Sequence, residues 1–152
     1  WNAATTADPV RLRKNLEILP FLAESGLCDA GKDISMGGII GTVLMLLETS
    51  GCGATLKIDA IPRPEVGPLE QWLLSFPSYG FLLSVRPENV ATVQACFHHH
   101  DVVCAEVGSI ESNTQLTLKM GNESAVFWDL SERSLTGFSM MSPTDVDHGD
   151  SP

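Results

Sequence analysis

The chain has 152 residues, of which 43% are hydrophobic and 18% charged, a composition typical of one globular domain and not of a disordered segment. Nineteen acidic against nine basic residues give a net charge of −10, which argues against binding to nucleic acid. No apolar stretch reaches the ~20 residues that a membrane helix needs. Four scattered cysteines without a CxxC pair indicate reduced, mostly buried thiols in a cytoplasmic protein. The chain begins at Trp1 and shows no signal peptide, so we expect a piece of a longer protein.

The first half of the chain predicts helices that alternate with strands. Helices are expected where apolar residues recur at spacings of three and four, and strands where they alternate or run together, with glycine and proline at the ends. By these criteria the chain contains a helix from Pro9 with Leu12, Leu16 and Leu19 on one face, ended or kinked at Pro20, a strand over 27–34, a helix over 36–49, a half-buried strand over 54–59 and a loop over 61–68. The helix over 36–49 is apolar nearly all round, so Leu44 and Leu47 are expected in the core, whereas Glu48 and Thr49 should tolerate change.

The second half of the chain predicts two further helices, separated by a strand, and then a β-meander. It contains a helix over 69–76, a central strand over 79–85, a helix from Pro87 to the three histidines at 98–100, a strand over 102–107 closed by Gly108, and strands over 115–120 and 125–128 around a turn at Gly121-Asn122. This order predicts an α+β fold, with a mixed β-sheet covered by helices, over residues 1–138. Residues 139–152 are expected to form an acidic flexible tail.

The segment from Lys32 to Gly41 carries the most chemical information, because it predicts a strand, a tight glycine turn and a helix start. The first N–H groups of a helix are unpaired and its dipole is positive there, so an anion can bind where glycine lets it approach. The candidate anion-binding or substrate-binding residues are Lys32, Asp33, Ser35, Met36, Gly37 and Gly38. In the alternative interpretation, which the spacing alone favours, the glycines permit close helix packing and Ser35 only caps the helix.

Other polar residues have simpler explanations. Adjacent histidines on a helix point about 100° apart, so His98, His99 and His100 cannot all face one metal ion and are read as a solvated helix end. Cys104 is interpreted as a packing residue. Arg63 and Arg86 are interpreted as ordinary surface cations; the alternative is that they contact a substrate phosphate. The sequence contains no Walker A or Gly-x-Ser-x-Gly motif, and it assigns no metal ligand and no catalytic residue.

Three segments together resemble a known family. Asp-Ile-Ser-Met-Gly-Gly-Ile-Ile-Gly-Thr at 33–42 is similar to the signature of the C-terminal domain of the aminoimidazole ribonucleotide (AIR) synthase superfamily, which includes AIR synthase, thiamine-monophosphate kinase, selenophosphate synthetase and a hydrogenase maturation factor. Residues 79–89 and 105–110 resemble the family's next strand and helix start and a later strand end, in the same order. Residues 1–6 and 128–130 look like the AIR synthase-related group of microbial proteins.

The resemblance implies a substrate-binding C-terminal domain of an ATP-dependent enzyme that acts on a small molecule by phosphoryl-transfer or ligase chemistry. It also implies that ATP and Mg are bound through the chain's own N-terminal domain, absent here, that the full-length protein is a homodimer, and that the isolated fragment is inactive. Asp29, Met36 and the segment 42–45 depart from AIR synthase itself, and the Gly41-Thr42 continuation is closer to the kinase and maturation-factor branches. The alternative is a non-catalytic binding, regulatory or dimerisation module that retains the fold.

Overall fold

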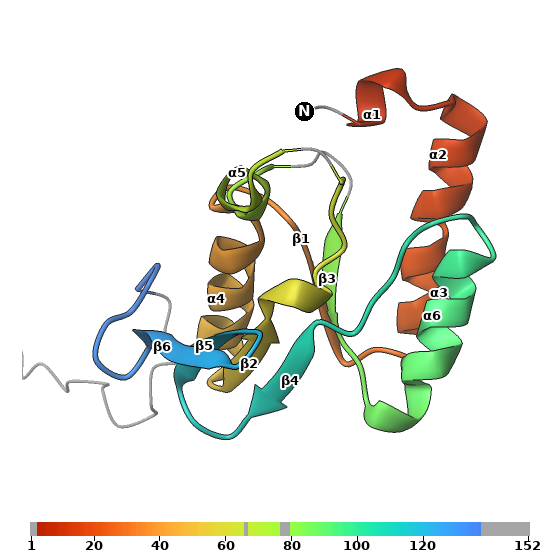
Figure 1. The fold of residues 1–152 in the computed structure, drawn as a ribbon. Coiled ribbons are helices and arrows are strands. Elements are labelled where there is room, and N and C mark those ends of the chain that lie inside the picture. The colour runs from red at the N-terminus through yellow and green to blue at the C-terminus, as the bar shows by residue number, and fades with distance from the viewer. Residues whose placement is uncertain (1–2, 66, 77–79, 138–152) are drawn as a thin grey trace, which may run out of the picture.

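The computed structural model describes residues 3–65, 67–76 and 80–137 (Figure 1). Its helices are α1 (Ala3–Thr6), α2 (Pro9–Leu16), α3 (Ile18–Glu24), α4 (Gly38–Ser50), α5 (Leu69–Leu73) and α6 (Val90–His98), with 3-10 turns at Ile58–Ala60 and Pro87–Asn89. Its strands are β1 (Ala30–Asp33), β2 (Gly53–Lys57), β3 (Phe81–Ser84), β4 (Gly108–Glu111), β5 (Gln115–Met120) and β6 (Glu123–Asp129).

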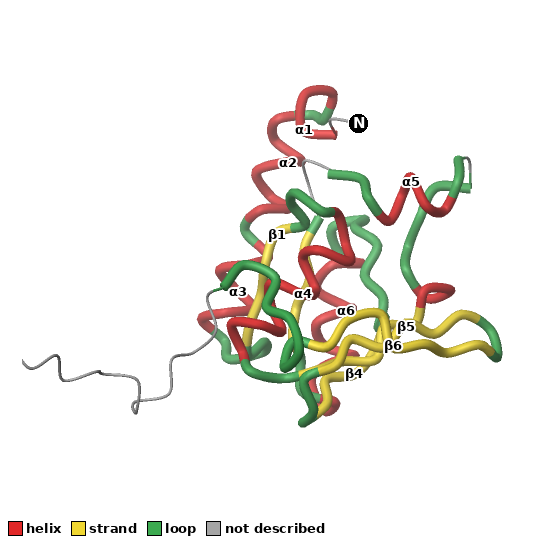
Figure 2. The backbone as a smooth tube through the Cα atoms, turned by 90° about the vertical axis from the view of Figure 1, so that its left-hand side faces the viewer, coloured by secondary structure: helices red, strands yellow, loops and turns green. Residues whose placement is uncertain are grey.

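The strands form two sheets. The larger sheet has the order β4-β2-β5-β6, in which β2 and β5 run parallel and the other neighbours are antiparallel. The smaller sheet pairs β1 with β3 in antiparallel register. Figure 2 shows β4, β5 and β6 together at one end of the molecule, away from β1. The predicted α+β fold, a mixed sheet covered by helices, is therefore confirmed.

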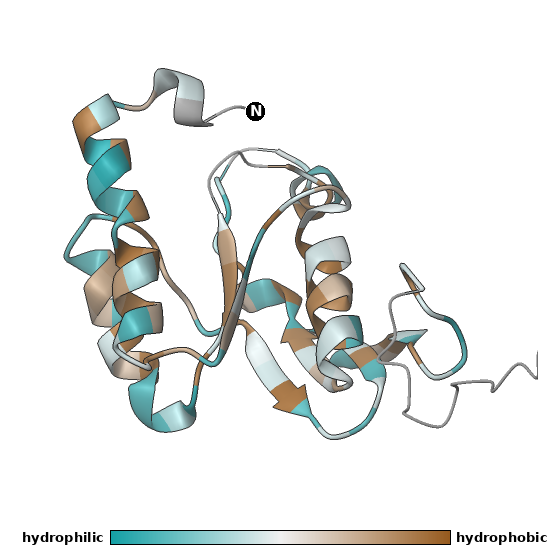
Figure 3. Ribbon diagram, turned by 180° about the vertical axis from the view of Figure 1, so that it is seen from behind, coloured by the Kyte–Doolittle hydropathy of each residue, from teal (hydrophilic) through white to brown (hydrophobic). Residues whose placement is uncertain are grey.

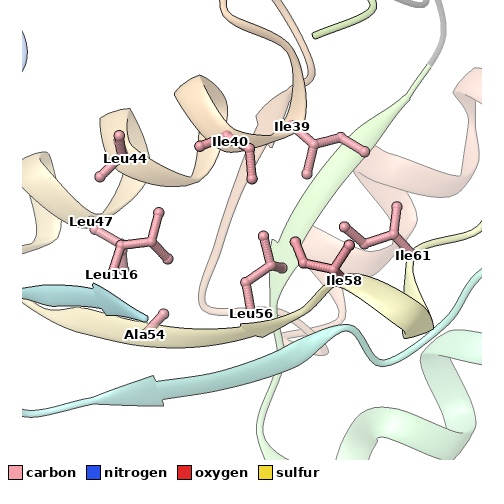
Figure 4. Close-up of a cluster of buried hydrophobic side chains, with 9 residues drawn as sticks. All are labelled: Ile39, Ile40, Leu44, Leu47, Ala54, Leu56, Ile58, Ile61 and Leu116. Carbon is pink, nitrogen blue, oxygen red and sulfur yellow. The ribbon is translucent and has the colours of Figure 1, made fainter. Parts of the chain in front are cut away.

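Helix α4 carries the main hydrophobic core. Nine apolar side chains from α4, β2, the following turn and β5 are buried against one another (Figure 4). Leu44 and Leu47 are among them, as predicted, and burial of a leucine side chain stabilises a fold by about 1.5–3 kcal/mol. Gly51 ends the helix with φ of 63°, a left-handed conformation that favours glycine. The glycine stop after this helix is therefore confirmed.

A second, smaller core joins α3 to α6. Ile18 and Leu22 of α3 are buried against Val93 and Phe97 of α6. The predicted helix is interrupted at Glu17, between α2 and α3, and Pro20 lies in the first turn of α3, where its missing N–H is harmless. The predicted apolar face is confirmed only at Leu19, which is half-buried and packs against this core; α2 buries no residue, and Leu16 is exposed.

Two strand predictions differ from the structure. β3 pairs only with β1 among the described residues, and all four of its side chains are half-buried, so it is not a central strand. Residues 102–107 form no strand, and Gly108 begins β4 instead of closing an earlier strand. Tyr79 and the predicted tail at 139–152 lie outside the described residues. No helix in the described ranges is long and apolar enough to cross a membrane.

Candidate functional site

The predicted glycine turn connects β1 to α4. Gly37 is the N-cap of α4 with φ of 88°, and Gly38 has φ of 62°, so both adopt the left-handed conformation that side chains rarely accept. No side chain caps the helix, so the prediction that Ser35 caps it is wrong. Two consecutive glycines therefore lead into α4, and among the described residues no side chain caps its first N–H groups.

Gly38 has a packing role. A Cβ atom at this position would lie 2.1 Å from the Leu73 carbonyl oxygen at the end of α5, which no real side chain allows. Its N–H donates to the Ser35 carbonyl oxygen at 3.0 Å, so it is not free to hold a ligand. Close packing thus accounts for Gly38, and an anion would have to bind to the N–H groups of its neighbours.

The hydrogen bonds inside the turn show which donors remain. The Ser35 N–H donates to Oγ1 of Thr42 at 3.2 Å, and the buried Thr42 hydroxyl donates to the Gly38 carbonyl oxygen at 2.7 Å. The Thr42 side chain therefore fixes the turn from inside α4. Among the described residues, the backbone N–H groups of Met36, Gly37 and Ile39 have no acceptor and are the candidate donors to an anion.

Lys32 brings a positive charge to this turn. Its Nζ atom lies 3.4 Å from Oγ of Ser35 and 3.3 Å from Oδ1 of Asp33, and its side chain is only 28% exposed. The Lys32 ammonium donates to the Ser35 oxygen, which leaves the Ser35 hydroxyl proton available to a ligand. The structure thus brings Lys32, Asp33 and Ser35 together at the mouth of the glycine turn.

Exposed apolar side chains accompany the turn. Met36 is 81% exposed, and Leu74 and Phe76, which follow α5, are 69% and 62% exposed. The backbone of Leu74 packs against Gly38, so the two segments are adjacent. This apolar rim was not predicted from the sequence, because no periodicity connects residues so far apart in the chain.

The remaining polar candidates have structural partners or lie apart. Arg86 forms an exposed ion pair with Asp29 at 3.2 Å, and Arg63 is exposed in its loop. All four cysteines are free, and burial raises the pKa of the Cys52 and Cys104 thiols, which disfavours the reactive thiolate. Within the described ranges, no three His, Cys, Asp or Glu side chains gather as metal ligands.

This geometry agrees with the comparison of the chain with known families. The profile of the AIR synthase related protein, C-terminal domain, matches residues 1–121, and the chain belongs to this family. The chain is 59% identical over 138 residues to the uncharacterised protein sll0787 of Synechocystis sp. PCC 6803, and covers 43% of that protein. It is 30% identical over 137 residues to the uncharacterised protein MJ0640 of Methanocaldococcus jannaschii, of which it covers 42%. The match includes 91% and 90% of this chain, which thus spans less than half the length of these relatives.

Solved structures share the fold at low sequence identity. The chain superimposes on Thermotoga maritima PurL complexed with ATP with a TM-score of 0.67 at 19% identity, covering 78% of this chain and 21% of PurL. It superimposes on E. coli HypE, a hydrogenase maturation protein, with a TM-score of 0.61 at 18% identity, covering 72% of this chain and 37% of HypE. These likenesses show the fold of an AIR synthase-related C-terminal domain.

Proposed function

We propose that this chain is the substrate-binding domain of an ATP-dependent enzyme, which transfers a phosphoryl group to a small metabolite or ligates one. The family membership and the fold shared with PurL, whose structures include complexes with ATP and ADP, support this proposal. ATP and Mg²⁺ are assigned to the chain's own N-terminal domain, which we expect to precede residue 1. The full-length protein is proposed to be a cytoplasmic homodimer.

One observation carries the proposal for the site: the half-buried Lys32 ammonium lies beside the uncapped start of α4. A cation, a hydroxyl donor at Ser35 and backbone N–H groups at Met36 and Gly37 are the groups that recognise phosphate or carboxylate. The helix field acts within its first turn, so it attracts an anion locally although the chain carries a net charge of −10. The substrate is therefore proposed to carry a phosphate or carboxylate group.

Substitution of the nearby carboxylate should change anion binding in the opposite direction from substitution of Lys32 or Ser35. Asp33 pairs with Lys32 and places a negative charge next to the proposed anion. Removing this charge by Asp33→Asn should strengthen anion binding, whereas Lys32→Gln and Ser35→Ala should weaken it. A general loss of structure would weaken binding in all three variants, so the opposite sign identifies a site.

Gly38 supports a second candidate, a non-catalytic module that retains the fold. The close approach of Gly38 to Leu73 explains the glycine without any ligand. The two candidates differ in the full-length protein: an enzyme hydrolyses or transfers the ATP γ-phosphate in the presence of its substrate, and a binding module does not. Screening metabolites for thermal stabilisation, followed by an ATPase assay with the hits, distinguishes them.

The experiment that tests the site is calorimetric titration of inorganic phosphate into the full-length protein. We expect Lys32→Gln to weaken binding about tenfold, as for the loss of one charge-assisted hydrogen bond. The matched control is Lys57→Gln, since Lys57 is also a strand lysine, and it pairs with Glu106 at 3.6 Å. Equal effects of both lysine variants would show a nonspecific charge effect and would overturn the proposal.

A further inference from the structure

An open pocket of about 430 Å³ lies where α2 faces the end of α6, away from the glycine turn. Its polar lining includes Arg11 and Lys14 on α2, His99, His100 and Asp101 after α6, and Asp8 at the start of α2. Figure 1 shows α2 and α6 on the opposite side of β1 and β3 from α4. Figure 3, which views the molecule from behind, shows that α2, the helix that follows α1, is largely hydrophilic. The pocket is therefore a separate feature from the proposed substrate site.

The pocket brings two cations, Arg11 and Lys14, together with two carboxylates, Asp8 and Asp101. Arg11 and Lys14 are two of nine lysines and arginines in the whole chain, and two imidazoles lie opposite them. No carboxylate within the described ranges lies at ion-pair distance from either cation. Asp8 accepts the Arg11 backbone N–H at 2.9 Å, so its carboxylate serves as the helix cap. Among the described residues, the Lys14 ammonium and the guanidinium N–H groups of Arg11 other than the one bonded to the Asp101 carbonyl oxygen are thus available to a ligand.

A hydrogen bond from a side chain joins the two walls of the pocket. Nη2 of Arg11 donates to the Asp101 carbonyl oxygen at 3.3 Å, which connects α2 to the turn after α6. Asp101 has φ of 56°, and the N–H groups of Asp101 and Val102 donate to the carbonyl oxygens of His98 and Phe97. This is a left-handed helix end, at which glycine is usual. Aspartate is among the non-glycine residues that adopt this conformation most readily, so Asp101 ends the helix without a glycine.

We propose that this pocket binds the phosphate group of a small phosphorylated molecule. The Arg11 guanidinium presents a planar fork of donors, Lys14 adds a point charge, and His99 and His100 offer ring N–H donors. A phosphate group accepts several such donors at once, and the volume is within the range of small-molecule pockets. The ligand is of the same chemical class as that proposed for the glycine turn, but it occupies a different place.

The test follows the histidine ring signals by NMR while inorganic pyrophosphate is added to the full-length protein at constant ionic strength. His98 is the internal control, because it ends α6 but does not line the pocket. We expect the His99 and His100 signals to shift together and the His98 signal to stay in place. The Lys32→Gln variant should leave these shifts unchanged, which separates this pocket from the glycine turn.

Charge variants give the second readout. Lys14→Gln should weaken binding about tenfold, whereas Arg13→Gln, on the same helix but outside the pocket lining, should change it less than twofold. Asp101→Asn removes a negative charge from the lining and should strengthen binding. Equal weakening by Lys14→Gln and Arg13→Gln, or histidine signals that do not move at 20 mM pyrophosphate, would overturn the proposal.

Discussion

The carboxylate of Glu48 should stabilise the fold by fastening the C-terminal segment to α4. Glu48 is only 6% exposed, and it accepts hydrogen bonds from the backbone N–H groups of Leu135 at 2.8 Å and Thr136 at 3.0 Å. The Thr136 hydroxyl also donates to this carboxylate, and the Gly137 N–H lies at 3.4 Å. Glu48→Gln keeps the shape of the side chain but removes its charge and replaces one acceptor oxygen by a donor.

The size of the effect follows from these contacts. A hydrogen bond to a charged acceptor contributes about 1.5–3 kcal/mol, against about 0.5–1.5 kcal/mol for a neutral one. Weakening of two such bonds predicts a loss of about 2 kcal/mol in the free energy of unfolding. With a urea slope near 2 kcal/mol per M, the midpoint should fall by about 1 M. The matched control, Glu24→Gln, changes an exposed glutamate at the end of α3 and should leave the midpoint in place.

Acid should remove this contribution. The Thr136 hydroxyl, aided by the backbone donors and opposed by burial, lowers the pKa of Glu48 below its usual value. A lowered pKa in the folded state gives stability that is complete above the unfolded-state pKa and is lost as the pH falls through the folded-state pKa. The gap between wild type and Glu48→Gln should therefore shrink from pH 7 to pH 3. An unchanged midpoint at pH 7, or a gap that does not shrink in acid, would refute the reasoning.

Three other predictions concern the core, the glycine turn and the hairpin. Leu47→Ala should cost about 2–5 kcal/mol in urea unfolding, because Leu47 is fully buried, and a smaller loss would contradict its place in the core. Gly38→Ala should lower the melting temperature far more than Gly51→Ala. Both glycines have left-handed φ, but only the Cβ atom added at Gly38 would lie 2.1 Å from the Leu73 carbonyl oxygen, so equal losses would contradict the packing role of Gly38. Hydrogen bonds, of which the one from the Ser131 hydroxyl has the largest effect, hold the pKa of Asp129 well below its usual range. Asp129→Asn should therefore lower the free energy of unfolding at pH 7 and have less effect near pH 2, which urea unfolding at both pH values measures.

Local patterns predicted those parts of the fold that depend on nearby residues. The apolar helix ended by Gly51, and the hairpin around Gly121 and Asn122, follow from periodicity and turn chemistry within a few residues. The apolar run at 81–84 has the composition of a central strand, but its hydrogen-bond partner is β1 alone among the described residues. Which neighbour a strand finds is a property of the whole fold, and periodicity does not contain it.

Long-range contacts account for the remaining errors. Glu48 was expected to tolerate change, because a helix-end glutamate is ordinarily solvated. Its partners at 135–137 lie 87 to 89 residues further along the chain, so no local pattern indicates its burial. Residues 102–107 show the converse error, since the apolar segment there predicted a strand and the structure forms none.

The candidate site was partly predicted from the sequence. The two consecutive glycines predicted the tight turn, but not that the start of α4 lacks a side-chain cap, and Lys32 was close enough in sequence to contribute charge. The direction of the Lys32 side chain and the close approach of α5 to Gly38 required the three-dimensional structure. The pocket beside Arg11 was not predicted, because its two walls are about 90 residues apart.

The measurement that tests the central claim most directly is an amide NMR titration of inorganic phosphate into the full-length protein. Binding at the glycine turn predicts shifts of the N–H signals of Met36, Gly37 and Ile39 that follow one binding curve. These shifts should be lost in Lys32→Gln and retained in Lys57→Gln, with both variants folded by circular dichroism. Signals from 36–39 that stay in place while phosphate binds elsewhere on the protein would contradict the claim that this turn is an anion site.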